Sequence, residues 1–243
     1  MAAQKLASGY CYRFFAALRT SSHVVCQCIL NLLLLQEMET LLTTLFWIVA
    51  LLYSVVIHEV SHGAVAYSLG DPTAKNLGRL TLNPLKHLDM FGSVLLPLIS
   101  FLLGGFIIGY AKPVPYNPLN LRDRKYGPAK VGMAGPASNM ALALLFGLTL
   151  RFLPDIFSSS LIPELLSIVV MLNLFLAVFN LFPIPPLDGH WLLLTFLPNR
   201  FTTIRTFLYK YSFALLLIFL FFIFPLLMPF ITTLFRLITG IGF

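Results

Sequence analysis

The sequence predicts an all-α polytopic membrane protein with about 4–6 transmembrane helices, a small β-strand loop and a re-entrant segment. Hydrophobic residues make up 58% of the 243 residues and charged residues only 10%, and the mean hydropathy is +0.89. Soluble domains contain about 25% charged residues, so this composition excludes a soluble globular fold. The apolar residues fall in long runs between short polar loops, as in a chain that crosses a bilayer several times.

The net charge of +7 arises from basic residues in the short loops between the apolar runs. Cytoplasmic loops of membrane proteins carry an excess of Lys and Arg, so this pattern predicts an orientation in the lipid bilayer and no nucleic-acid partner. The three cysteines all lie before residue 38: Cys11, Cys26 and Cys28. They provide no disulfide framework for the body of the chain, and Cys26 and Cys28 beside His23 would make only a weak metal site.

Residues 1–37 differ from the rest of the chain. Their apolar run at 24–35 is too short to span a bilayer comfortably, because a spanning helix needs about 20 apolar residues. No small-residue cleavage site follows the run, which argues against a signal peptide. We interpret this segment as an N-terminal extension that is disordered or not native, with Met38 as the start of the protein proper.

The first predicted span covers about 40–69, which is long enough to cross the bilayer with some tilt. It ends in the polar turn Gly70-Asp71-Pro72. In the loop that follows, apolar and polar residues alternate over 78–82 before an Asn-Pro pair ends the pattern. This alternation predicts a short β-strand.

The apolar segment 91–110 has a basic loop on each side. Lys75, Arg79 and Lys86 precede it, and the loop 111–130 carries five further basic residues. Two successive basic loops are expected on the same side of the membrane, so a single crossing between them would misplace one loop. We therefore expect a re-entrant hairpin whose backbone other helices shield; an ordinary span that violates the charge rule is the alternative.

Two further spans are predicted over about 129–152 and 163–182, because both runs have the length and hydropathy that a crossing needs. The loop between them has an acidic residue and no Lys or Arg, which fits the far side of the membrane. Residues 38–200 form the core of the protein. The C-terminal region 201–243 is apolar and interrupted by prolines, so it is either one kinked span or a span with an interfacial helix.

The sequence His58-Glu59-Val60-Ser61-His62 lies inside the first predicted span. Residues four apart share one face of a helix, so His58 and His62 can aim ring nitrogens at one metal ion while Glu59 reaches a neighbouring water. Charged side chains in a membrane cost about 2.5–3.5 kcal/mol each on insertion scales and occur mainly where they function. Zinc hydrolases use this spacing; two core histidines with other partners are the structural alternative.

A catalytic zinc ion has three protein ligands and one open position, so a third ligand is required. Asp188 is the best candidate, because it directly follows the third span in the proline-rich segment 180–189. Three prolines disfavour a helix there, which lets the carboxylate point where a regular helix could not place it. Gly189 allows a close approach of the backbone. His190 is the rival candidate.

Together these motifs resemble the site-2 protease family of intramembrane zinc metalloproteases, peptidase family M50. The H-E-x-x-H sequence and the Asn-x-x-Pro-x-Pro-x-Leu-Asp-Gly sequence at 180–189 carry the resemblance. The segments 109–115 (Gly-Tyr-Ala-Lys-Pro-Val-Pro) and 134–139 (Ala-Gly-Pro-Ala-Ser-Asn) resemble the short bacterial branch, which lacks PDZ and CBS domains. The resemblance extends over residues 38–197.

The resemblance implies one Zn²⁺ per chain, with Glu59 as the catalytic base. It implies three zinc ligands: His58, His62 and Asp188. It also implies that Asn139 and Asn180 line the site.

The activity expected from this resemblance is hydrolysis of peptide bonds in or near the transmembrane segments of a membrane protein substrate, as in regulated intramembrane proteolysis. The expected location is the bacterial inner membrane, with the active site nearer the cytoplasmic face. A non-hydrolytic membrane metal transporter is the alternative, although it gives no reason for a glutamate beside the first histidine. Nothing in the sequence indicates an oligomeric state.

Overall fold

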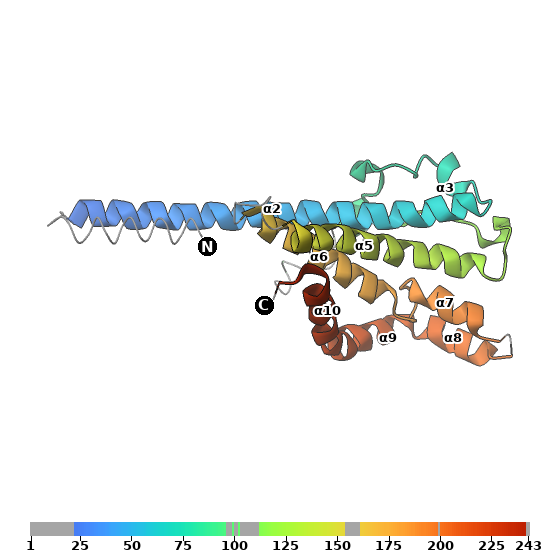
Figure 1. Cartoon of the computed structure of the whole chain (residues 1–243). Helices are drawn as coiled ribbons and strands as arrows, with labels where there is room; N and C mark the ends of the chain where they lie inside the picture. The colour runs from blue at the N-terminus through green and yellow to red at the C-terminus, as the bar shows by residue number, and fades with distance from the viewer. Residues whose placement is uncertain are drawn as a thin grey trace.

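The computed structural model describes residues 22–95, 99, 102, 112–153, 161–198 and 200–241. This part of the chain is mostly helical (Figure 1). Four helical stretches are long and apolar enough to cross a membrane: Gln36–Ser68, Gly127–Phe152, Leu161–Asn180 and Ser212–Thr239. The prediction of a helical protein with several membrane spans is therefore confirmed.

The longest helix, α2 (Ser22–Ser68), contains 47 residues and extends for about 70 Å at 1.5 Å per residue. Its N-terminal half projects beyond the other helices (Figure 1). Large apolar side chains are exposed there, with Leu41 at 58%, Leu42 at 58% and Leu45 at 51%. Such a surface suits lipid tails. The helix runs across the boundary after residue 37, so the division into an extension and a core remains a prediction.

Helices α5 (Gly127–Phe152) and α6 (Leu161–Asn180) pack against each other and against α2. Helix α10 (Phe224–Thr239) covers the side of α5 and α6 (Figure 1). Small residues allow close helix approach in membranes, and Gly147 of α5 is one of them. A Cβ atom there would lie 2.4 Å from Cγ2 of Ile238 on α10.

The C-terminal region begins with the short helix α8 (Thr202–Lys210), and Tyr211 separates it from the last span. The span consists of three consecutive helical segments: α9 (Ser212–Ile218), the π-turn η5 (Phe219–Ile223) and α10. A π-turn and internal prolines are the usual causes of a kink. The region is therefore a kinked span preceded by a separate short helix.

The structure contradicts the predicted strand at 78–82, which is irregular and follows the short helix α3 (Thr73–Asn76). The backbone N–H of Arg79 donates to the carbonyl of Ala74 over 2.9 Å, so this backbone closes a turn. A strand requires a neighbouring strand to complete its hydrogen-bond ladder. Within the described residues no segment pairs with 78–82 as a second strand. The alternation of apolar and polar residues was therefore not enough to predict a strand.

The loops on either side of the apolar segment 91–110 meet at one end of the bundle. The backbone N–H of Lys112 donates to the carbonyl of His87 over 2.9 Å, and the short helices η1 (Pro84–Lys86) and η3 (Pro118–Asn120) lie in these two loops. Both basic loops thus share one end. The expected re-entrant hairpin lies mostly outside the described residues.

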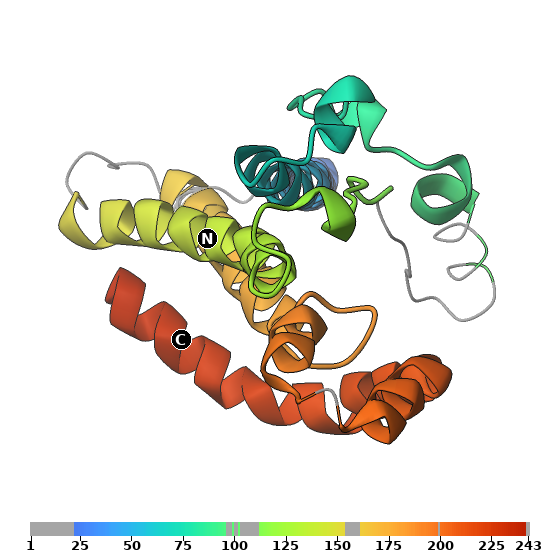
Figure 2. The ribbon, with the colours of Figure 1, turned by 90° about the vertical axis from the view of Figure 1, so that its right-hand side faces the viewer.

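The same end of the bundle collects the C-terminus of α2, the N-terminus of α5, and helices α7 (Gly189–Phe196) and α8 (Figure 1). Figure 2 looks onto this end, with α2 seen nearly along its axis. Segments far apart in the sequence therefore meet where His58 and His62 approach the end of their helix.

Candidate metal centre

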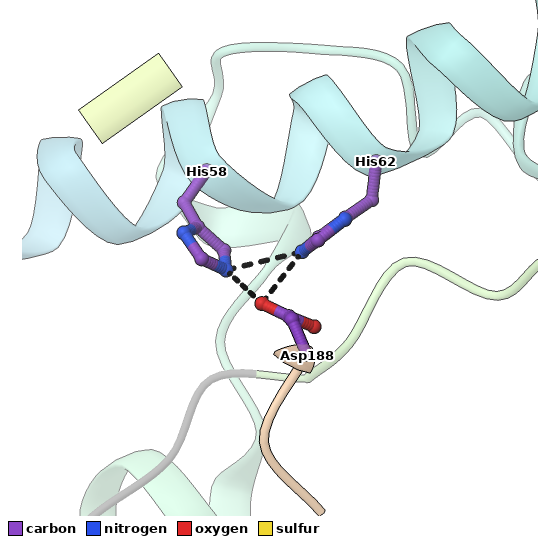
Figure 3. Close-up of side chains that lie close together, drawn as sticks. All are labelled: His58, His62 and Asp188. Atoms are coloured by element: carbon purple, nitrogen blue, oxygen red, sulfur yellow. Dashed lines mark hydrogen bonds and ion pairs between the residues drawn. The ribbon is translucent and has the colours of Figure 1, made fainter. Parts of the chain in front are cut away.

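Three of the sequence-predicted ligands meet between α2 and the turn before α7 (Figure 3). Nε2 of His58 lies 2.9 Å from Oδ2 of Asp188, and Nε2 of His62 lies 3.2 Å from the same oxygen. The two Nε2 atoms lie 3.0 Å apart. Over the described residues these three form the one group of His, Cys, Asp or Glu side chains that could hold a metal ion.

The outer nitrogens of both imidazoles contact oxygen acceptors. Nδ1 of His58 lies 2.8 Å from Oδ1 of Asn139, and Nδ1 of His62 lies 2.7 Å from the carbonyl of Val131. Because each contact requires a proton on Nδ1, it leaves the Nε2 lone pair free. Both histidines are therefore held in the tautomer that a metal ligand at Nε2 needs.

A chain of buried amides extends this arrangement through the bundle. Nδ2 of Asn139 donates to Oδ1 of Asn173 over 3.1 Å, and Nδ2 of Asn173 donates to Oγ of Ser54 over 2.9 Å. Asn139 and Asn173 are completely buried. The chain joins α5, α6 and α2 and orients His58, so Asn173 and Ser54 belong to the site although sequence reasoning missed them.

The three ligand atoms fit a zinc ion. The Nε2 atoms of the two histidines and a carboxylate oxygen of Asp188 converge on one point. Their lone pairs repel one another unless a cation lies between them. A tetrahedral zinc ion with bonds of about 2.0–2.2 Å keeps its ligand atoms about 3.3–3.6 Å apart, only a few tenths of an ångström more than the distances found. Residues of this kind are also the usual zinc ligands.

Gly135 on α5 keeps this space open. A Cβ atom at this position would lie 2.5 Å from Nε2 of both His58 and His62. Any side chain larger than hydrogen would therefore push against the two ligand atoms. This close approach explains a glycine in the middle of a span, where it otherwise weakens the helix.

The proline-rich turn places Asp188 immediately before α7. A Cβ atom on Gly189 would lie 2.1 Å from the carbonyl oxygen of Leu181, so the turn can close this tightly only with glycine. The rival ligand His190 points elsewhere, since its Nδ1 donates to the carbonyl of Leu187 over 2.6 Å. The structure thus brings Asp188, rather than His190, to the histidine pair.

Glu59 is held by the segment that begins at Lys112. Its Oε2 accepts a hydrogen bond of 2.8 Å from the backbone N–H of Val114. The side chain of Val114 packs against Gly63, where an added Cβ would lie 2.7 Å from Cγ1 of the valine. One carboxylate oxygen of Glu59 is therefore fixed, on a residue that directly follows His58 and precedes His62 by three positions.

Asp71 anchors the same segment to the end of α2. Its carboxylate accepts from the Thr73 N–H and hydroxyl at 3.2 and 2.5 Å, from the Asn117 N–H at 2.6 Å and from the Asn120 amide at 2.8 Å. Burial raises the pKa of Asp71, but these hydrogen bonds outweigh it and hold the pKa below the ordinary value of 3.8. Asp71 therefore fixes the loop as a carboxylate.

Asn180, the other amide expected to line the site, lies at the end of α6. Its Nδ2 donates to the carbonyl of Leu176 on the same helix over 3.0 Å, whereas the described partners of the His58 and His62 side chains are Asn139, Val131 and Asp188. Its role in the site remains a prediction.

Comparisons with known proteins agree on one family. The family model of peptidase family M50 matches residues 155–220, which include Asp188. "Putative zinc metalloprotease YwhC" of Bacillus subtilis is 37% identical over 180 residues, which cover 71% of this chain and 78% of the relative. No solved structure matches the chain.

Two further relatives are named "Putative zinc metalloprotease Rip2". The protein of Mycolicibacterium smegmatis is 36% identical over 143 residues, covering 57% of this chain and 52% of the relative. The protein of Mycobacterium tuberculosis (strain H37Rv) is 32% identical over 139 residues with the same coverage. Because the match to YwhC spans most of that relative, this chain belongs to peptidase family M50, the site-2 protease family, and is a membrane zinc metalloprotease.

Proposed function

We propose that the protein is an intramembrane zinc metalloendopeptidase that hydrolyses peptide bonds in or near the transmembrane segments of membrane proteins. The observation that carries this proposal is the convergence of three ligand atoms from His58, His62 and Asp188. Two of the three ligands lie within a helix that is apolar and long enough to span a membrane. Such a site is suited to substrates that are themselves in the bilayer.

The position of the histidines supports cleavage below the membrane surface. His62 and His58 lie six and ten residues before the end of α2 at Ser68, or about 9 and 15 Å along a helix. The basic loops meet at this end, and such loops face the cytoplasm. We place the active site nearer the cytoplasmic side of a bacterial inner membrane, within reach of the end of a substrate helix.

A zinc ion bound here supplies Lewis-acid polarisation of the scissile carbonyl and activation of a water. Glu59 acts as the general base through the carboxylate oxygen that Val114 does not hold. It removes a proton from the attacking water and returns that proton to the leaving amine. Because a helix shields its carbonyls in hydrogen bonds, the substrate has to unwind locally before attack.

The Glu59→Gln variant tests this function. It retains the ligands and is expected to bind zinc as the wild type does, while cleavage falls by about 10²–10⁴-fold because the base is lost. Single-span membrane proteins that co-purify with the variant, and that the wild-type protein cleaves, would identify substrates. Unimpaired cleavage by the variant, or trapped proteins that wild-type protein leaves intact, would contradict the proposal.

A further inference from the structure

A cavity of about 850 Å³ lies beside the metal centre, between residues 124–128, α7 and α8. It does not contain the histidines or Asp188. Three of its lining residues are basic: Arg124, Lys125 and Arg205. No acidic residue lines it, so its surface favours an anion.

Arg205 provides the most firmly held positive charge in this cavity. Its Nη2 donates to the carbonyls of Leu194 and Leu197 over 3.0 and 2.8 Å, which fixes the guanidinium in place. Its Nε–H is buried and has no partner in the described part of the chain. The guanidinium therefore lines the cavity as a fixed positive charge, which favours an anionic oxygen there.

The cavity lies at the level where spans leave the bilayer. Tyr126 directly precedes the span α5, and α8 ends one residue before the last span begins at Ser212. Tyr126, Trp191 and Tyr209 line the cavity, and Trp and Tyr are enriched at membrane interfaces. The groups present at this level are lipid phosphates, and the cytoplasmic leaflet is rich in anionic lipids.

We propose that this cavity binds the phosphate-containing headgroup of an anionic phospholipid. The three basic residues bind the phosphate, while the aromatic side chains contact the glycerol and the first methylenes. An anionic lipid is favoured over a zwitterionic one because no carboxylate in the cavity would pair with a choline or an ammonium group. The proposal does not depend on proteolysis.

One wall of the cavity is continuous with the metal centre. The backbone N–H of Trp191 donates to the carbonyl of Asp188 over 3.1 Å. A Cβ atom on Gly132 would lie 3.0 Å from both that carbonyl oxygen and Cβ of Trp191. Bound lipid therefore contacts Trp191, which is hydrogen-bonded to the turn that carries a predicted zinc ligand, and Trp191 can report the binding.

Lipid titration of the full chain in detergent tests the proposal. The second tryptophan, Trp47, is exchanged for Phe so that Trp191 alone fluoresces. Short-chain phosphatidylglycerol should give a saturable change with a midpoint at least about tenfold below that of phosphatidylcholine, because each basic residue contributes roughly fivefold to binding an anionic lipid surface. Native mass spectrometry in parallel should find phosphatidylglycerol retained on the chain.

Two double variants locate the site. Arg124→Gln with Lys125→Gln removes two charges from the cavity and should raise the phosphatidylglycerol midpoint about tenfold or more. Arg122→Gln with Lys130→Gln removes the same charge from the same segment without touching the cavity, and should leave the midpoint within about twofold. The Glu59→Gln form should bind lipid as the wild type does, which separates this result from proteolysis.

Three outcomes would overturn the proposal. Equal binding of phosphatidylglycerol and phosphatidylcholine by mass spectrometry would exclude selection by charge. An equal loss of phosphatidylglycerol affinity in the two double variants would indicate that the lipid is attracted to the whole basic face of the protein. Displacement of the lipid by inorganic phosphate at the same concentration would indicate a site for soluble phosphate.

Discussion

Oδ1 of Asn139 accepts a hydrogen bond from Nδ1 of His58 over 2.8 Å, although 81 positions separate the two residues in the chain. This contact joins α5 to α2 and leaves Nε2 of the histidine free to bind a metal ion. Partners of this kind orient metal-ligating histidines and raise their basicity. Asn139, which is itself tied to Asn173, is therefore a positioning residue of the metal centre.

Replacement of Asn139 by Ala should lower the zinc affinity by about 10–100-fold, because His58 loses the acceptor that fixes its tautomer. Competition with a chromophoric zinc chelator measures this change. Asn180→Ala is the matched control, since that amide donates to its own helix at Leu176, and it should keep the wild-type affinity. Equal affinities of the two variants would refute the role given to Asn139.

Gly135→Ala should prevent zinc binding without unfolding the bundle. Alanine favours a helix over glycine by about 1 kcal/mol, so any loss arises from the Cβ atom placed 2.5 Å from both Nε2 atoms. Metal content and far-ultraviolet circular dichroism of the purified variant measure the two effects. Gly147→Ala, which clashes with Ile238 at 2.4 Å, is the control and should keep its zinc. A Gly135→Ala protein that still binds zinc would contradict the role given to Gly135.

Val114→Pro should slow catalysis while zinc remains bound, because proline removes the N–H that holds Glu59. The segment already contains Pro113 and Pro115, so another proline is compatible with an extended backbone. We expect a fall in kcat and a shift in its pH profile, with a smaller change in KM. Val114→Ala is the control, because it retains the N–H. If Val114→Ala lowered kcat as strongly as Val114→Pro, the loss of side-chain packing would be the cause.

Asp71→Asn should loosen the loop 112–121, because an amide cannot satisfy all the N–H groups that the carboxylate accepts. A buried donor left unsatisfied costs about 1–3 kcal/mol. Hydrogen exchange of the backbone amides around Asn117 and Asn120 should be faster in the variant at neutral pH. Unchanged protection of these amides would show that Asp71 does not anchor the loop.

The same contact predicts a dependence on pH. The hydrogen bonds hold the pKa of Asp71 below 3.8 in the folded protein, so its contribution to stability is fully present above about pH 4. It is lost as the pH falls through the lowered pKa of the folded state. The difference in protection between wild type and Asp71→Asn should therefore shrink below pH 3.8, and a constant difference would exclude the carboxylate as its origin.

The sequence allowed the spans to be predicted well, because each is long and apolar. The predicted spans 129–152 and 163–182 became Gly127–Phe152 and Leu161–Asn180. The strand at 78–82 failed for a physical reason. A five-residue alternation is a weak signal, and a strand forms only where a second segment pairs with it.

The ligand set was also within reach of sequence reasoning, since His58 and His62 lie one helical turn apart and Asp188 is in an unusual proline-rich turn. The contacts that support these ligands could not be predicted from the sequence. Ser54 and Asn173 are 119 positions apart, and the Glu59–Val114 hydrogen bond spans 55 positions. Such pairs leave no local pattern; only the polarity of Asn173 in an apolar run indicated a buried partner.

X-ray absorption at the zinc edge, together with metal analysis, tests most directly whether His58, His62 and Asp188 hold one zinc ion. We predict one zinc per chain with nitrogen and oxygen neighbours at about 2.0–2.2 Å, and loss of that zinc in Asp188→Ala. Sulfur neighbours at about 2.3 Å, or an unchanged zinc spectrum in Asp188→Ala, would contradict it.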